Sequence, residues 1–141
     1  MQERDRVRGE LLRFISAAAE EAKQIRECKR PDVGFLRIHL RKYILAKFML
    51  PESSVETESI RELIEISLAR MMQAAPELVE ELDTARSCAG ATSAMVKKAL
   101  LFQAMEREFG IELPAREAAA AADISALAGL VWRCRSEREQ T

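Results

Sequence analysis

Residues 90–113 constrain the fold more than any other stretch, because they carry the pattern of one whole helix. Thr92 and Ser93 are residue types that cap the first turn of a helix with a hydroxyl oxygen. Apolar side chains then recur at steps of three and four residues, at Leu101, Phe102, Met105 and Phe109. This spacing places them on one face of a helix, which we expect to lie against a core.

The same pattern predicts where the helix ends. Gly110 follows Phe109 at the position where a left-handed glycine commonly ends a helix. Leu113 precedes Pro114, and a residue before proline avoids the helical conformation. We therefore expect the helix to end near Phe109 and the chain to continue in an extended conformation.

Residues 106–113, Glu-Arg-Glu-Phe-Gly-Ile-Glu-Leu, resemble the end of the second helix of acyl and peptidyl carrier proteins. Downstream, residues 115–122 resemble the short third helix of that family, and residues 123–131 are similar to its capped last helix. Upstream, residues 90–94, Gly-Ala-Thr-Ser-Ala, are similar to the family's Gly-x-Asp-Ser-Leu motif. The resemblance extends over about residues 57–133.

The resemblance implies a carrier-like bundle of four helices whose motif serine carries a 4′-phosphopantetheine arm. Ser93 matches that serine, and the free N–H groups at a helix start favour a phosphodiester there. Thr92 and Ala94 stand where the family has aspartate and leucine, and Ser93 lies sixteen residues before Phe109, where the family has about fourteen. An ungapped alignment therefore places Met95 at the serine position, and two extra helical residues rotate a side chain by roughly 200°. Capping alone and attachment both stay open for Ser93.

The whole chain has the composition of an all-α protein. It has few aromatic residues, five glycines and four prolines, and no segment alternates apolar with polar residues as a half-buried strand does. Residues 1–50 are predicted to form an N-terminal extension of two helices, and residues 51–141 a carrier-like helical domain. Residues 51–57, which begin with Pro51 and continue with small and polar residues, are predicted to link the two.

Three further helices and one short segment are expected. Residues 4–28 carry an apolar stripe, and residues 33–50 are apolar nearly all round, so we expect the second helix to be buried against the first helix, the carrier-like unit or a second copy. Thr57 is predicted to cap a helix over residues 57–71, and Pro76 to begin a short segment that ends near residue 82. The predicted shared core consists of Ile60, Leu63, Ile64, Leu68, Leu101, Met105, Phe109, Ile111, Leu127 and Leu130.

Residue types argue against several functional classes. The three cysteines, Cys28, Cys88 and Cys134, lack the paired spacing of metal or redox sites, and their odd number suits a reducing cytoplasm. Charged residues interrupt every apolar segment, so we expect no membrane span. His39 is the only histidine and lies in an apolar helix, where a satisfied structural histidine is favoured over a general base. We therefore expect neither a metal site nor catalysis by the chain itself.

Net charge is −1, but it is unevenly distributed: residues 1–50 hold twelve Lys and Arg against seven Asp and Glu, and the remainder ten against sixteen. The basic charges do not segregate to one face, which argues against binding of nucleic acid. The acids at Glu77, Glu80, Glu81 and Asp83 are interpreted as a solvated face or as a contact for basic partner enzymes.

Two functions follow from these observations. The first is a cytoplasmic carrier in lipid, polyketide or nonribosomal peptide biosynthesis, which a phosphopantetheinyl transferase loads at Ser93 and which serves partner enzymes. The second is a carrier-shaped or simply helical interaction module without the arm. In that case, the basic helices of residues 1–50 bind a partner or form a homodimer.

Overall fold

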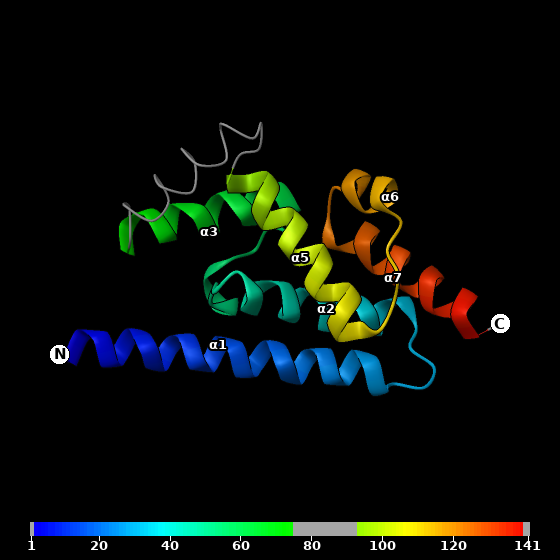
Figure 1. The fold of residues 1–141 in the computed structure, drawn as a ribbon, viewed down its shortest axis with the longest axis horizontal. Helices are drawn as coiled ribbons and strands as arrows, with labels where there is room; N and C mark the ends of the chain where they lie inside the picture. The colour runs from blue at the N-terminus through cyan, green and yellow to red at the C-terminus, as the bar shows by residue number, and fades with distance from the viewer. Residues whose placement is uncertain (1, 75–92, 140–141) are drawn as a thin grey trace.

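The computed structural model of the chain describes residues 2–74 and 93–139 (Figure 1). Within these ranges the chain forms six α-helices, one short 3-10 helix and no strand. They are α1 (Gln2–Glu27), α2 (Val33–Lys47), the 3-10 helix η1 (Glu52–Ser54), α3 (Ile60–Ala74), α5 (Ser93–Phe109), α6 (Ala115–Ala120) and α7 (Ile124–Glu139). The all-α prediction is confirmed, whereas the short segment predicted from Pro76 to residue 82 lies outside the described residues.

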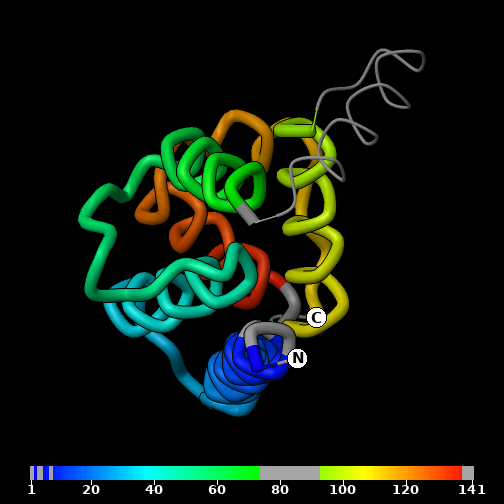
Figure 2. The backbone as a smooth tube through the Cα atoms, turned by 90° about the vertical axis from the view of Figure 1, so that its left-hand side faces the viewer, coloured from blue at the N-terminus to red at the C-terminus, as the bar shows by residue number. Residues whose placement is uncertain are grey.

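The helix α2 lies at the centre of the molecule. It runs antiparallel to α1 and also packs against α7, as Figures 1 and 2 show. Asp32 caps its start by accepting a hydrogen bond from the backbone N–H of Phe35 at 2.7 Å. Its side chains Leu36, Leu40, Tyr43, Ile44 and Leu45 are at most 1% exposed. The helix that was predicted to be buried is therefore buried between α1 and α7.

The helix α1 is covered by its neighbours only along its C-terminal half. Ala18, Ala22 and Ile25 lie in the core, whereas Leu12 is 55% exposed and Ile15 61% exposed. Figure 1 shows that the N-terminal part of α1 extends beyond the end of α2. The apolar stripe of α1 therefore continues past the residues that cover it.

One hydrophobic core joins the helices. Nine of the ten residues predicted to share a core are buried in it, and Leu68 is partly buried and packs against it. The prediction of that core is confirmed. The same core also contains residues of α1 and α2, so it crosses the predicted boundary at residue 51. The division into an extension of residues 1–50 and a domain of residues 51–141 stays a prediction.

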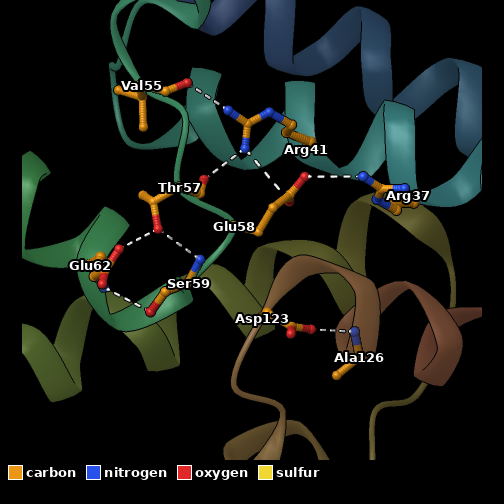
Figure 3. Close-up of polar contacts among 9 residues, drawn as sticks. All are labelled: Arg37, Arg41, Val55, Thr57, Glu58, Ser59, Glu62, Asp123 and Ala126. Atoms are coloured by element: carbon orange, nitrogen blue, oxygen red, sulfur yellow. Dashed lines mark hydrogen bonds and ion pairs between the residues drawn. The ribbon is translucent and has the colours of Figure 1, made fainter.

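The start of α3 corrects one prediction from the sequence. The cap is Ser59 and not Thr57: the Ser59 hydroxyl oxygen accepts from the Glu62 N–H at 3.3 Å, and its carbonyl oxygen accepts from the Leu63 N–H at 3.0 Å. The Thr57 hydroxyl oxygen instead accepts from the Ser59 N–H at 3.1 Å (Figure 3). Thr57 and Ser59 both carry a hydroxyl group, and the helix begins directly after the second of them.

An arginine of α2 holds the segment between α2 and α3 in place. The Arg41 guanidinium donates to the carbonyl oxygens of Thr57 at 2.8 Å and Val55 at 2.7 Å, and it lies 3.6 Å from Glu58 Oε2 (Figure 3). The neighbouring Arg37 forms an ion pair with the other Glu58 oxygen at 3.5 Å. The predicted linker is therefore fixed against α2.

The C-terminal end of α5 and the start of α7 follow the predicted pattern. Gly110 has a φ of 68°, and its N–H donates to the Glu106 carbonyl oxygen at 3.0 Å, as expected for a glycine that ends a helix. Asp123 caps α7 by accepting from the Ala126 N–H at 2.7 Å. The starts of α3 and α7 are also joined, because the Ile124 N–H donates to the Glu58 carbonyl oxygen at 3.0 Å.

Candidate functional site

Ser93, the only residue that the sequence singled out for attachment, is the first residue of α5 and is partly buried. The residues that complete its motif upstream, Gly90 and Thr92, lie outside the described part of the chain. The acids at Glu77, Glu80, Glu81 and Asp83 lie outside it too. The structure therefore places the serine at the start of α5, and the rest of the motif stays a prediction.

The helical register of α5 bears directly on Ser93. The helix is α-helical at every residue from Ser93 to Phe109, without a bulge. The side chains of Ser93 and Met95 consequently leave the helix axis about 200° apart. Met95, which an ungapped alignment places at the serine position, is 58% exposed. The serine and the position expected for it thus lie on different faces of one regular helix.

The electrostatics at the start of α5 favour an anion. The first turn carries no acidic residue, and the N–H groups of a helix start bear partial positive charge. Lys97 and Lys98 follow in the next turn. Lys98 Nζ donates to the Ala119 carbonyl oxygen at 3.0 Å, which places its charge between α5 and the end of α6.

Lys97 has an unusual environment for a lysine. Its amine lies 3.7 Å from the Met71 sulfur and 5.1 Å above the centre of the Phe48 ring. Burial between these side chains lowers the pKa of Lys97 below its usual value. The sequence pattern did not single out this residue, because its contacts come from α3 and from the end of α2.

The opposite end of α5 is bound firmly to the N-terminal helices. The Glu108 carboxylate accepts a hydrogen bond from the Tyr43 hydroxyl and forms an ion pair with Lys47 Nζ at 3.1 Å. The Tyr43 ring also packs on Phe109, with ring centres 4.8 Å apart. Burial, followed by the hydrogen bond to Glu108, raises the pKa of Tyr43 far above its usual value. These contacts are structural, since they hold the helix on the hairpin of α1 and α2.

The sequence analysis also considered His39 and the cysteines, of which Cys88 lies outside the described residues. His39 Nδ1 lies 2.6 Å from Glu21 Oε2, and the histidine ring packs on Phe35, so His39 is satisfied as expected. Cys28 and Cys134 are partly buried free thiols. Across residues 2–74 and 93–139, no group of three or more His, Cys, Asp or Glu side chains is arranged to hold a metal ion. Nor does any helix in these ranges have the length and apolar character needed to cross a membrane.

One cleft between described residues lies away from Ser93. It has a volume of about 800 Å³ and is lined by Gly110, Ile111, Glu112, Leu113, Pro114, Cys134 and Glu137. These residues belong to the segment after α5 and to the end of α7. Since Ser93 begins α5, the cleft and the serine lie at opposite ends of that helix.

Comparisons with protein-family models, with curated proteins and with solved structures found no match for this chain. The likeness to carrier proteins therefore rests on the residues quoted above, mainly residues 106–113 and 123–131.

Proposed function

We propose that the chain is a cytoplasmic carrier protein that holds an acyl or aminoacyl group as a thioester on a 4′-phosphopantetheine arm at Ser93. One observation carries this proposal: a serine begins the 17-residue helix α5, which ends at Phe109 and is followed by Gly-Ile-Glu-Leu, the short α6 and the capped α7. The arm would supply the reactive thiol. The chain itself would present that thiol to partner enzymes of lipid, polyketide or nonribosomal peptide biosynthesis.

The physical support comes from the charge distribution around the start of α5. A phosphodiester bears a negative charge, which the partial positive charge of the first turn would stabilise. No acidic side chain within the first turn of α5 would repel that charge. Tyr43 and Lys47 hold the other end of α5 through Glu108, so the helix that carries the modified serine would be fixed on α2.

Intact-mass measurement tests the proposal. The protein is incubated with coenzyme A and a permissive phosphopantetheinyl transferase. We expect wild-type protein and the control Ser125→Ala, which alters an exposed serine near the start of α7, to gain the mass of one arm. Ser93→Ala should gain none. An unchanged wild-type mass, or an equal gain in Ser93→Ala, contradicts the proposal.

A second candidate is a carrier-shaped interaction module that lacks the arm. Two observations favour it: the uninterrupted register of α5, which turns Ser93 away from the face of Met95, and the exposed apolar side chains Leu12 and Ile15 on α1. Such side chains at the projecting end of α1 suit contact with a second copy of this chain. In this case the mass stays unchanged, and light scattering shows a dimer that Ile15→Glu converts to a monomer.

A further inference from the structure

A second cleft, of about 200 Å³, lies between the α1–α2 linker and α7. Its lining residues are Arg30, Pro31, Trp132, Arg135 and Ser136, and we refer to it as the Trp132 cleft. Figure 1 shows the linker and the last turns of α7 at the same end of the molecule, far from the N-terminus of α1. None of the lining residues belongs to α5, so this cleft is separate from the site proposed around Ser93.

Hydrogen bonds fix the walls of the Trp132 cleft. The Arg135 guanidinium of α7 donates to the Cys28 carbonyl oxygen at 2.8 Å and also to the Ile25 carbonyl oxygen. Carbonyl groups at a helix end lack partners within their own helix, so these bonds tie the end of α1 to α7. On the other side of the linker, Asp32 caps α2 and Pro31 restricts the backbone before it. Arg30 thus lies on a short segment that is held at both ends.

The chemistry of the Trp132 cleft suits an acidic group. Trp132 is 41% exposed, and Arg30 is exposed beside it. No carboxylate lines the cleft among the described residues, and none of these residues forms an ion pair with Arg30. A guanidinium group binds carboxylates in a planar, bidentate geometry. Tryptophan and arginine are also the residue types most enriched among the side chains that dominate binding at protein interfaces.

The size of the Trp132 cleft limits what it can bind. Sites for cofactors and drug-sized ligands are usually about 300–1,000 Å³, so this cleft is too small for a whole cofactor. It is large enough for one side chain of a partner protein. We propose that the Trp132 cleft binds an acidic peptide segment of a partner protein, with one Glu or Asp carboxylate on Arg30 and the adjoining aliphatic atoms against the Trp132 ring.

Fluorescence of the full-length protein tests this proposal, because Trp132 is the only tryptophan in the chain. The probe is the capped peptide acetyl-Glu-Glu-Leu-Glu-Glu-amide, and the matched peptide with glutamine in place of glutamate is the control. We expect the acidic peptide to shift the Trp132 emission to shorter wavelength in a saturable way, since it removes water from the ring. Raising the salt concentration from about 0.05 M to about 0.5 M should weaken this binding several-fold, because the ion pair is solvent-exposed.

Two variants with the same change of charge separate a specific contact from general attraction. Arg30→Gln should weaken binding of the acidic peptide about fivefold or more, whereas Lys29→Gln, one residue away and outside the lining, should leave it within about twofold. Equal weakening by both variants, or an equal shift with the glutamine peptide, overturns the proposal. An equal shift with inorganic phosphate also overturns it, because the cleft would then recognise any small anion.

Discussion

The two ends of α5 differ in how the protein holds them. At the C-terminal end, Met105 and Phe109 are at most 3% exposed, and Glu108 contacts Tyr43 and Lys47 of α2. No residue of α5 before Leu101 falls among the buried ones, and Met95 and Leu100 are each 58% exposed. One helix is therefore anchored in the core at one end and presents apolar side chains on the surface at the other.

This difference separates the part of α5 that supports the fold from the part available for function. A binding or modification site must be reachable by a partner, and the buried end of α5 is not. The contacts that fix Phe109 and Glu108 also come from the hairpin of α1 and α2, which ties the proposed carrier-like helices to the N-terminal ones. The proposals for Ser93 depend on the accessible end and on the rigidity of the anchored one.

Phe109→Ala should have the largest effect on stability. Removing a buried phenylalanine leaves a cavity under the Tyr43 ring, so we expect the free energy of unfolding to fall by about 3–5 kcal/mol. Leu100→Ala is the matched control at the exposed end and should change it by less than about 0.5 kcal/mol. Urea unfolding of the two variants measures the difference, and similar losses would mean that the two ends are not held differently.

Gly110→Ala tests the turn that ends the anchored half. At a φ of 68° a Cβ atom clashes with the backbone, and we expect a loss of about 1–2 kcal/mol. Gly129→Ala is the control, because a Cβ atom there meets nothing within 4 Å inside α7. It should stabilise the protein by about 0.5–1 kcal/mol, since alanine is the better helix former. If both variants change unfolding in the same direction, the left-handed turn at Gly110 does not determine where α5 ends.

The raised pKa of Tyr43 predicts a loss of stability at alkaline pH. Burial and the hydrogen bond to Glu108 keep the hydroxyl protonated in the folded protein, whereas an unfolded tyrosine ionises near pH ~10. The contribution of Tyr43 is therefore fully present below that pH and falls above it, by up to about 1.4 kcal/mol per pH unit. Tyr43→Phe should lack this fall.

Comparison of the two proteins isolates Tyr43 from other groups. The lowered pKa of Lys97 acts in the opposite direction, because stability rises with pH while the folded protein releases that proton before the unfolded chain does. Both proteins share this contribution. Urea unfolding at a series of alkaline pH values gives the difference, and parallel curves for wild type and Tyr43→Phe would contradict the assigned role of Tyr43.

Glu106→Ala should have the smallest effect of this series. Glu106 Oε2 accepts a hydrogen bond from the Leu113 N–H at 3.1 Å, which ties the segment after α5 to the helix. Loss of this hydrogen bond should lower the free energy of unfolding by about 0.5–1.5 kcal/mol. Glu112→Ala, an exposed acid in the same segment, should stay within about 0.5 kcal/mol. Thermal unfolding measures the stability of both variants. If the unfolding temperature falls equally in both, the effect comes from the change in net charge and not from the hydrogen bond of Glu106.

Local patterns predicted the end of α5 and the start of α7, because the residues that decide them are close in sequence, whereas α2, predicted to reach residue 50, ends at Lys47. The turn at Gly110 and the cap at Asp123 each depend on partners within four residues. The cap of α3 was predicted wrongly because Thr57 and Ser59 each carry a hydroxyl group that can cap a helix. The chain begins α3 after Ser59, where the backbone of Ser59 and of the next residue pairs with that of residue 122 and Asp123. The spacing of residues along the sequence does not show which distant residues come into contact.

Long-range contacts were beyond prediction for the same reason. The bonds from Tyr43 to Glu108 and from Arg135 to the end of α1 join residues 65 or more positions apart. The apolar stripe of α1 was visible in the sequence, but its coverage depends on where α2 ends. The candidate serine was visible as well, whereas its face on α5 depends on the helix being regular from its first residue.

Hydrogen exchange along α5 tests the central comparison most directly. Amide protection reports the free energy of the opening that exposes each N–H, and buried segments usually exchange only when the whole protein unfolds. We predict that the amides of residues 105–109 are protected to the level of global unfolding, and that those of residues 97–100 exchange at least about tenfold faster through local opening. Equal protection along the whole helix, or faster exchange at the Phe109 end, would contradict the claim that the C-terminal end of α5 is the more firmly held.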